Sequence, residues 1–260
     1  MTANNRRKLL TPVTALPTAL PTALPTALPT ILLTGFEAFG GDALNPSWLA
    51  VQALHGDVIE GHAVVAAQLP TQFSASTKAL RRLLRRYRPA LVIAVGLAGG
   101  RSALSLERVA INIQDARIPD NADAQPIDLP VVKRGPAAYF STLPIKAMQR
   151  ALENEGVPAE ISQTAGTFVC NHVFYALMHQ LQTDADALPT SNACGRSGGK
   201  SSAQTEMGNA PRGGFIHVPY LPEQGSPNMA LADMVRGLRT ACASALTTKK
   251  DLAHAGGAIS

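Results

Sequence analysis

The sequence predicts an α/β protein built as a three-layer α/β/α sandwich around an open, mixed, mostly parallel twisted sheet. Two observations lead to this prediction. From Ile31 onward, short apolar runs alternate with stretches of helical periodicity, which is typical of strands joined by crossover helices. A chain of 260 residues that is 46% hydrophobic and 16% charged can also bury a full core. We therefore expect one α/β domain over residues 31–248.

The individual elements follow from apolar patterning and from residues that start helices. Short apolar runs predict strands at 31–34, 62–68, 91–95, 108–113, 160–163 and 215–218. Helical periodicity predicts helices at 46–54, 74–87, 145–155, 171–181 and 228–246. Pro46 suits a first helical turn, Ser74 or Ser76 can cap the second helix, and Asn228 can cap the last.

Three segments lie outside this pattern. Residues 1–30 form a tail in which ALPT repeats between residues 15 and 30, and prolines this dense prevent both helix and sheet, so we expect an extended tail. A docking role for the tail is a less favoured alternative. Residues 182–212 are polar and aperiodic, which predicts a flexible surface insertion, and Cys194 within it is either a reactive thiol or a bystander. Residues 249–260 form a C-terminal tail.

The charge pattern and the cysteines bear on partners and compartment. The net charge of +5 is concentrated near the N-terminus and on the predicted helix 74–87, where five arginines follow one another between residues 81 and 88. A solvated helix face explains them better than a nucleic-acid patch, because no recognition motif accompanies them. Three widely spaced cysteines without zinc-ligand spacing, and the lack of a ~20-residue apolar run, predict a cytoplasmic protein without a membrane partner, a metal or another cofactor.

Cys170 is the first candidate for chemistry. It stands after an apolar strand and a small-residue turn, directly before an apolar-periodic helix. The free N–H groups and the dipole of a helix N-terminus favour an anion, so we expect a lowered thiol pKa there. A buried structural cysteine is about equally compatible with this position.

A nucleophilic thiol needs a base, and His217 is the best placed of the six histidines. It ends a short strand, where a parallel sheet delivers side chains to its ligand-binding edge, although a structural role is common there too. His172 follows Cys170 by two residues on a helix and should point away from the thiol. Glu107, in the apolar segment ERVAINI, can orient a catalytic histidine. The alternative is an ion pair with Arg101 or Arg108.

Four motifs together resemble the pyroglutamyl-peptidase I family, the C15 cysteine peptidases. They are GFEAFGGDALNPS, GGRSALSLERVAIN, SQTAGTFVCN and FIHVPYLPEQ, and the similarity reaches from about Ile31 to about Leu246. The resemblance implies a single catalytic α/β domain, a Glu107–Cys170–His217 triad and a homo-oligomer, either a tetramer or a dimer. It also implies that the enzyme hydrolyses the bond after an N-terminal pyroglutamate through an acyl-enzyme, with pyroglutamylated peptides as substrates and no cofactor.

The resemblance also suggests residues around the substrate. Phe36 and Phe39 are expected to wall the pyroglutamate pocket, with Asn45 nearby and Phe168 lining the same space. For the phenylalanines the alternative is ordinary core packing. Arg117 is a candidate for stabilising the oxyanion beside the backbone N–H of Cys170, or else a structural partner of Asp115 or Asp120.

The sequence departs from the family pattern at three places. Leu97 stands where the family usually has a glutamine close to the substrate ring, which predicts weaker substrate binding by roughly 0.5–1.5 kcal/mol. Ala38 replaces a common proline, and the 182–212 insertion lengthens the spacing between Cys170 and His217 to 47 residues. A weakly active homologue that binds capped peptides is therefore the main alternative. A nucleoside-processing α/β enzyme is more distant, because the sequence has neither GxGxxG nor a Walker lysine.

Overall fold

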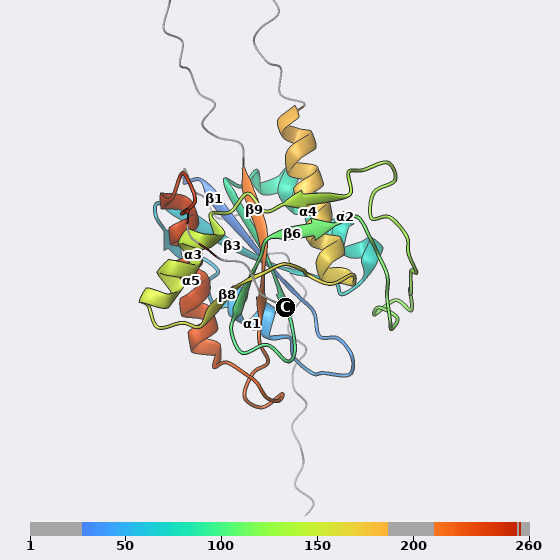
Figure 1. Ribbon diagram of the computed structural model, residues 1–260, viewed down its shortest axis with the longest axis horizontal. Helices are drawn as coiled ribbons and strands as arrows, with labels where there is room; N and C mark the ends of the chain where they lie inside the picture. Colours follow the sequence, from blue (N-terminus) through green and yellow to red (C-terminus); the bar gives the residue numbers. More distant parts are fainter. Residues whose placement is uncertain (1–27, 187–210, 254, 256–260) are drawn as a thin grey trace, which may run out of the picture.

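The computed structural model describes residues 28–186, 211–253 and 255. Its centre is a seven-stranded sheet in the order β2-β3-β1-β4-β9-β5-β8 (Figure 1). The strands are β1 (Thr30–Phe36), β2 (Val58–Ile59), β3 (His62–Leu69), β4 (Leu91–Leu97), β5 (Leu104–Glu107), β8 (Ala159–Ser162) and β9 (Arg212–Val218). A separate two-stranded antiparallel sheet joins β6 (Val109–Ile111) to β7 (Ala138–Phe140).

The large sheet is mixed and mostly parallel, as predicted. The neighbours β3, β1, β4 and β9 run parallel to one another. The reversals occur at the short edge strand β2 and between β9 and β5, after which β8 pairs in parallel with β5. The strands β5 and β8 therefore run antiparallel to β3, β1, β4 and β9. The carboxyl end of β5, at Glu107, pairs with Phe215 in the middle of β9.

Within the described residues, five helices cover the two faces of the sheet (Figure 1). One face carries α1 (Pro46–Gln52), α3 (Ile145–Asn154) and α5 (Leu231–Thr247), and the other carries α2 (Phe73–Tyr87) and α4 (Val169–Asp186). The predicted three-layer α/β/α arrangement is therefore confirmed.

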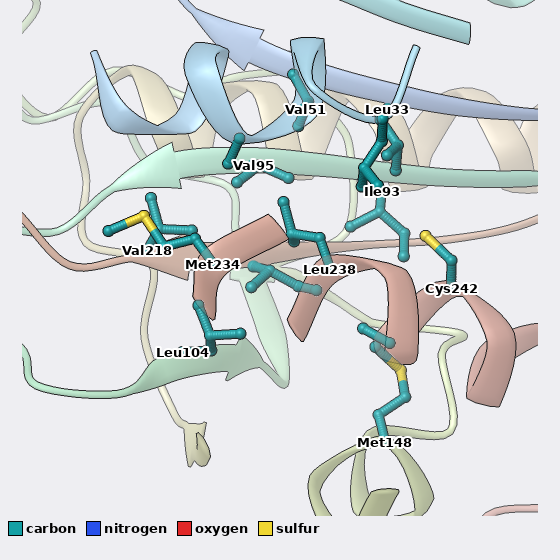
Figure 2. Packing of buried hydrophobic residues seen from close by; sticks show 14 of the residues in the cluster. Leu33, Val51, Ile93, Val95, Leu104, Met148, Val218, Met234, Leu238 and Cys242 are labelled. Atoms are coloured by element: carbon teal, nitrogen blue, oxygen red, sulfur yellow. The ribbon is translucent and has the colours of Figure 1, made fainter. Parts of the chain in front are cut away.

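Each face of the sheet has its own apolar core. Alternate residues of a strand point to opposite faces, so Val95 belongs to the core beneath α1, α3 and α5, whereas Ala94 belongs to the core beneath α2 and α4. Figure 2 shows the first of these cores, where Met234, Leu238 and Cys242 of α5 project toward the sheet. The buried central strands β1 and β4 read as nearly continuous apolar runs because both of their faces are covered.

Several element boundaries differ from the sequence prediction. Only the three-residue strand β6 falls within the predicted strand 108–113, whereas β5, which ends at Glu107, lies before this range and was not predicted. Neither Ser74 nor Ser76 caps α2: its first N–H, that of Phe73, donates to Asp120 Oδ2 instead. The last helix begins at Leu231 after Ala230, and Asn228 donates to the Gly225 carbonyl. The short strands β2 and β7 were not predicted.

The predictions for residues 1–27 and for Cys194 lie outside the described residues, as do most of the predicted insertion 182–212 and part of the C-terminal tail. The proposed division into a tail at 1–30, a domain at 31–248 and a tail at 249–260 therefore stays a prediction.

Candidate active site

The structure brings the three predicted catalytic side chains to the same face of the sheet. His217 is on β9, Glu107 is at the carboxyl end of β5, and Cys170 is in the first turn of α4. Glu107 pairs across the ladder with Phe215, two residues before His217, so the carboxylate and the imidazole are diagonal neighbours. The reversal of β5 relative to β9 is what creates this neighbourhood.

Glu107 and His217 form a buried hydrogen bond. His217 Nδ1 lies 2.8 Å from Glu107 Oε1, and both residues are almost inaccessible to solvent. A carboxylate only accepts hydrogen bonds, so Nδ1 carries the hydrogen of this contact. The second ring nitrogen, Nε2, is then free to act as a base when the imidazole is neutral.

Cys170 reaches the sheet at a position that has no side chain. Gly96 on β4 is paired in register with His217 on β9, and an ideal Cβ at Gly96 would lie only 2.8 Å from Cys170 Sγ. The thiol therefore fills the place next to the imidazole, since paired residues on neighbouring strands share a face and lie about 5 Å apart. Phe215 bounds the same space, with its ring centroid 4.8 Å from that of His217.

The protein does not lower the pKa of Cys170, contrary to the expectation from its place at a helix start. Burial raises the pKa of this thiol to about 12, and the negative charge of Glu107 adds to the effect. The positive charge of Arg101 opposes both. Cys170 therefore rests as a neutral thiol at neutral pH and needs a base to become a nucleophile.

The turn before α4 is held by its own hydrogen bonds. Ser162 and Thr164 bond to each other, and the Gly166 N–H donates to the Thr164 hydroxyl. Gly166 has φ +75°, which only glycine adopts without strain. Thr167 donates to the Asp115 carbonyl, so the turn is also tied to the chain after β6.

Asn171 fastens the start of α4 to the neighbouring chain. Its amide donates to the carbonyls of Ile111 and Ile113 and accepts from the Ile111 N–H. The backbone that carries Cys170 is thus fixed on both sides, as a precise catalytic geometry requires.

A cavity of about 420 Å³ opens beside Cys170. Aromatic rings form much of its wall: Phe39 and Phe168 lie 5.2 Å apart between ring centroids, and Phe36 lies deeper against Phe215. Its polar lining comes from Asp42, Asn45, Thr71 and Tyr220. Such a chamber suits a small, flat and largely neutral group.

The structure places the other predicted site residues as follows. Phe36, Phe39, Asn45, Leu97 and Phe168 all line this cavity. The side chain of Asn45 is already engaged, because it donates to the Glu37 carbonyl and accepts from Ser47 at the start of α1. Arg117 is exposed and lines a second cavity on the far side of Phe168, together with Asp115 and Ile118.

Sequence reasoning missed the residues that hold the loop between β1 and α1, which lines the cavity. Glu37 Oε1 accepts from the Thr71 N–H and from Asn121, and Asn121 also donates to the Ala38 carbonyl. These contacts join segments up to 84 residues apart, so no local pattern could have indicated them. Within the described residues no cluster of metal-ligating side chains occurs, and no helix there has the length and apolarity to cross a bilayer.

A buried carboxylate bonded to an imidazole, with a thiol at the neighbouring position and a cavity beside it, is the arrangement of a thiol hydrolase. Sequence comparison identifies the family, because a sequence model described as pyroglutamyl peptidase matches residues 29–190.

Relatives of known name extend the match over most of the chain. The chain is 54% identical over 233 residues to pyrrolidone-carboxylate peptidase of Cupriavidus taiwanensis, covering 88% of this chain and 98% of that protein. Identity to the protein of the same name from Bacillus cytotoxicus is 44% over 231 residues, covering 87% of this chain and 97% of the relative.

Solved structures agree with the sequence comparison. Pyroglutamyl peptidase I from Bacillus amyloliquefaciens superposes with a TM-score of 0.77 at 39% identity, covering 88% of this chain and all of that one. Pyrrolidone carboxyl peptidase from Thermococcus litoralis gives 0.73 at 34% identity, covering 84% and 94%. The chain belongs to the pyroglutamyl peptidase family, which confirms the predicted resemblance and the enzyme class of cysteine-type peptidase.

Proposed function

We propose that this enzyme removes N-terminal pyroglutamate from peptides with Cys170 as nucleophile, His217 as general base and acid, and Glu107 as the carboxylate that orients His217. The observation that carries the assignment is the 2.8 Å contact between His217 Nδ1 and Glu107 Oε1, next to a strand position where Gly96 leaves room for the thiol. The family membership supports the substrate class.

The first half of the reaction transfers the acyl group to sulfur. His217 Nε2 accepts the Cys170 proton as Sγ attacks the carbonyl carbon that joins pyroglutamate to the next residue. The raised pKa of Cys170 makes this transfer part of the attack, since little thiolate exists beforehand. His217 then protonates the departing amine, and the thioester forms.

The second half regenerates the enzyme. His217 removes a proton from a water molecule, which attacks the thioester carbonyl and releases pyroglutamate and the thiol. Each tetrahedral intermediate carries an oxyanion that needs donors. We assign the backbone N–H of Cys170 to this role, because N–H groups in the first turn of a helix have no partner within the helix. Arg117 stays a second candidate, although the cavity that it lines is a separate one.

The cavity supports recognition of the lactam ring. Phe39 and Phe168 contact each other and form one aromatic wall against which a flat five-membered ring can pack, while Phe36 closes the inner wall. Asn45 contributes by holding the loop, since its own amide is engaged. An N-terminal prolyl or glutaminyl residue carries a charged amine, which an aromatic enclosure of this kind desolvates unfavourably.

The decisive experiment is hydrolysis of a chromogenic pyroglutamyl amide beside the matching prolyl and glutaminyl amides, for wild type, Cys170→Ser and His217→Ala. We expect turnover of the pyroglutamyl compound alone, and its loss in both variants. Absence of turnover by freshly reduced wild type would contradict the proposal and favour a homologue that only binds capped peptides.

We further propose that the enzyme acts in the cytoplasm as a homo-oligomer, a tetramer or a dimer, without a nucleic-acid or membrane partner. Support for association comes from large apolar side chains exposed on the segment 113–140, including Phe140 at 71% and Ile127 at 66% exposure. The odd number of cysteines supports a reducing compartment. Light scattering after gel filtration tests the oligomer, and a monomer at assay concentration would contradict it.

A further inference from the structure

Arg101 joins the catalytic carboxylate to the turn that carries the nucleophile. Its Nη1 lies 2.8 Å from Glu107 Oε1, and its Nη2 donates to the Thr164 carbonyl over 3.2 Å. Arg101 stands in the connection between β4 and β5, whereas Thr164 belongs to the turn that leads into α4. One guanidinium thus joins the end of β5 to a turn that lies 63 residues after Arg101 in the sequence.

The contact with Glu107 is made where a charge is costly to bury. Glu107 is fully buried, and its Oε1 receives both Arg101 and His217 Nδ1, while Oε2 has no hydrogen-bond partner among the described residues. A carboxylate buried without a charged partner is unfavourable, so a cation bonded to it stabilises this site. The Arg101 cation is the charged partner of this buried carboxylate and holds the oxygen that faces His217.

The contact with Thr164 concerns the thiol. Thr164 organises the turn that ends at α4, because its hydroxyl accepts from the Gly166 N–H and its carbonyl from Ser162. The guanidinium fork is planar and rigid, so holding Glu107 with one arm sets the place of the turn with the other. The distance between the Cys170 thiol and the His217 imidazole depends on the position of this turn, because the turn leads into the first residues of α4.

We propose that Arg101 is a positioning residue of this enzyme: it holds the Glu107 carboxylate and the nucleophile turn in register, so that His217 and Cys170 meet in a reactive geometry. This inference rests on the proposed roles of Cys170, His217 and Glu107. It assigns to Arg101 a function in the reaction without direct contact with the substrate.

Removing the Arg101 charge also has an electrostatic consequence that can be measured. Burial and Glu107 raise the pKa of Cys170, and Arg101 is the charged group that lowers it. The other ionisable side chains around this contact are His217 on β9, Arg108 directly after β5, and Glu160 on β8, which accepts from Ser105. They are unchanged in an Arg101 variant, so a shifted Cys170 profile reports on Arg101 itself.

The test compares Arg101→Gln and Arg101→Lys with wild type. Steady-state hydrolysis of the pyroglutamyl amide gives kcat and KM. Alkylation of Cys170 by iodoacetamide, followed at the Cys170 peptide by mass spectrometry from about pH 6 to pH 10, gives thiol reactivity. Arg150→Gln is the matched control, because Arg150 is exposed on α3, where it pairs with the exposed Glu153.

We expect Arg101→Gln to lower kcat on the order of 10- to 100-fold with KM changed less than about two-fold. In this variant Cys170 should be alkylated more slowly than in wild type, and the increase of the alkylation rate with pH should occur at a higher pH. Arg101→Lys keeps the positive charge but not the planar guanidinium, so it should recover part of kcat and part of the Cys170 alkylation rate. Arg150→Gln should match wild type in both quantities. An unchanged kcat and alkylation profile in Arg101→Gln would overturn the proposal.

Equal losses in both Arg101 variants, accompanied by a lower melting temperature, would also overturn it, because they indicate a purely structural role. Should Arg101→Gln fail to fold, Arg101→Lys decides alone: a lower kcat at unchanged KM and melting temperature supports the proposal, and wild-type values contradict it. If wild type does not hydrolyse the pyroglutamyl amide, the proposed function fails, but the alkylation profiles still decide the role of Arg101.

Discussion

At Gly96 the lack of a side chain makes room for the nucleophile. An ideal Cβ there would approach Cys170 Sγ and Phe215 Cζ to 2.8 Å each, so something must move if one is added. The Phe215 ring is packed against Phe36 and Phe174, which leaves the thiol as the more movable neighbour. The geometry of the nucleophile is therefore sensitive to a single methyl group on β4.

We predict that Gly96→Ala lowers kcat by about 100-fold, because a displacement near 1 Å has this effect on an oriented reaction. Steady-state kinetics checks it. Gly237→Ala is the control, since its Cβ would crowd Leu104 and Val157 on the opposite face of the sheet. Gly237→Ala should lose stability and keep the wild-type kcat. Undiminished turnover by Gly96→Ala would disprove the close contact between position 96 and the Cys170 thiol.

Leu97 is the residue of the cavity with the clearest consequence for affinity. It lines the chamber with an apolar surface where the family pattern has an amide. We predict that Leu97→Gln lowers KM about two- to ten-fold at unchanged kcat, because one added hydrogen bond to the lactam contributes about 0.5–1.5 kcal/mol. Leu97→Met, which stays apolar, should leave KM near wild type. Equal KM values for all three proteins would exclude contact between position 97 and the ring.

The residues proposed to carry the chemistry were predicted from short motifs, but the residues that support them were not. Cys170, His217 and Glu107 each stand in a segment with a recognisable local pattern. Arg101 and Gly96 act through partners that are distant in sequence, and their roles depend on strand register and on the turn before α4. The thiol pKa was mispredicted for a related reason, since burial in the folded site outweighs the helix start.

Among the elements, α2 depends on a cap from outside its own sequence. Asp120 lies in the long connection between β6 and β7, is 5% exposed, and accepts from the Phe73 N–H at the first position of α2. Its second oxygen accepts from the N–H groups of Ala122 and Ala124. A carboxylate at a helix start also interacts favourably with the helix dipole.

We predict that Asp120→Ala lowers the free energy of unfolding by about 1–3 kcal/mol, since it leaves the buried Phe73 N–H and two partly buried N–H groups without their acceptor. Urea unfolding followed by circular dichroism measures this. Asp233→Ala, which removes an exposed carboxylate paired with Arg236, should change stability by about 0.5 kcal/mol or less. Equal effects of the two variants would show that Asp120 is an ordinary surface charge.

Strand and helix positions were largely predictable, whereas strand direction was not. Apolar runs indicated β1, β3, β4 and β9, because strands covered on both faces need such runs, and β8 was also predicted although it is a partly buried edge strand. The pattern of a strand does not specify whether it runs parallel or antiparallel to its neighbour, so the reversal of β5 against β9 had no local signal. The strands β2 and β7 are only two and three residues long, too short to show any period.

For the molecule as a whole, the buried side chain of His172 makes the free energy of unfolding depend on pH in the acidic range. It is 7% exposed, meets the Phe73 ring edge to face at 5.4 Å, and neither ring nitrogen has a well-formed hydrogen bond among the described residues. Burial lowers the pKa of His172 from 6.5 to about 4, partly opposed by the Phe73 backbone. Between these two values the unfolded chain binds the proton and the folded chain does not, so stability falls with falling pH.

We predict that the free energy of unfolding decreases by up to about 3 kcal/mol from His172 alone as the pH drops from 6.5 to 4. His172→Phe, which keeps the aromatic contact and cannot take up a proton, should lose less over this range. Denaturant unfolding of both proteins at a series of pH values measures the difference. Parallel pH curves would show that His172 does not contribute.

At alkaline pH the free energy of unfolding is expected to fall with rising pH, the opposite of its dependence at acidic pH. Burial raises the pKa of Cys170 and of Cys242 from 9.0 to about 12. The folded protein then holds protons that the unfolded chain releases, so stability should decline as the pH rises above 9.

The place of β9 in the middle of the sheet bears on when the enzyme becomes active. During synthesis β1 to β8 emerge first, yet β4 and β5 can be joined only by β9, which comes last of the strands. Until then the nascent chain exposes two unpaired strand edges, which are prone to wrong pairing and need protection. The same late strand delivers His217 to a thiol and a carboxylate already made, so hydrolytic activity switches on with the closing step of folding.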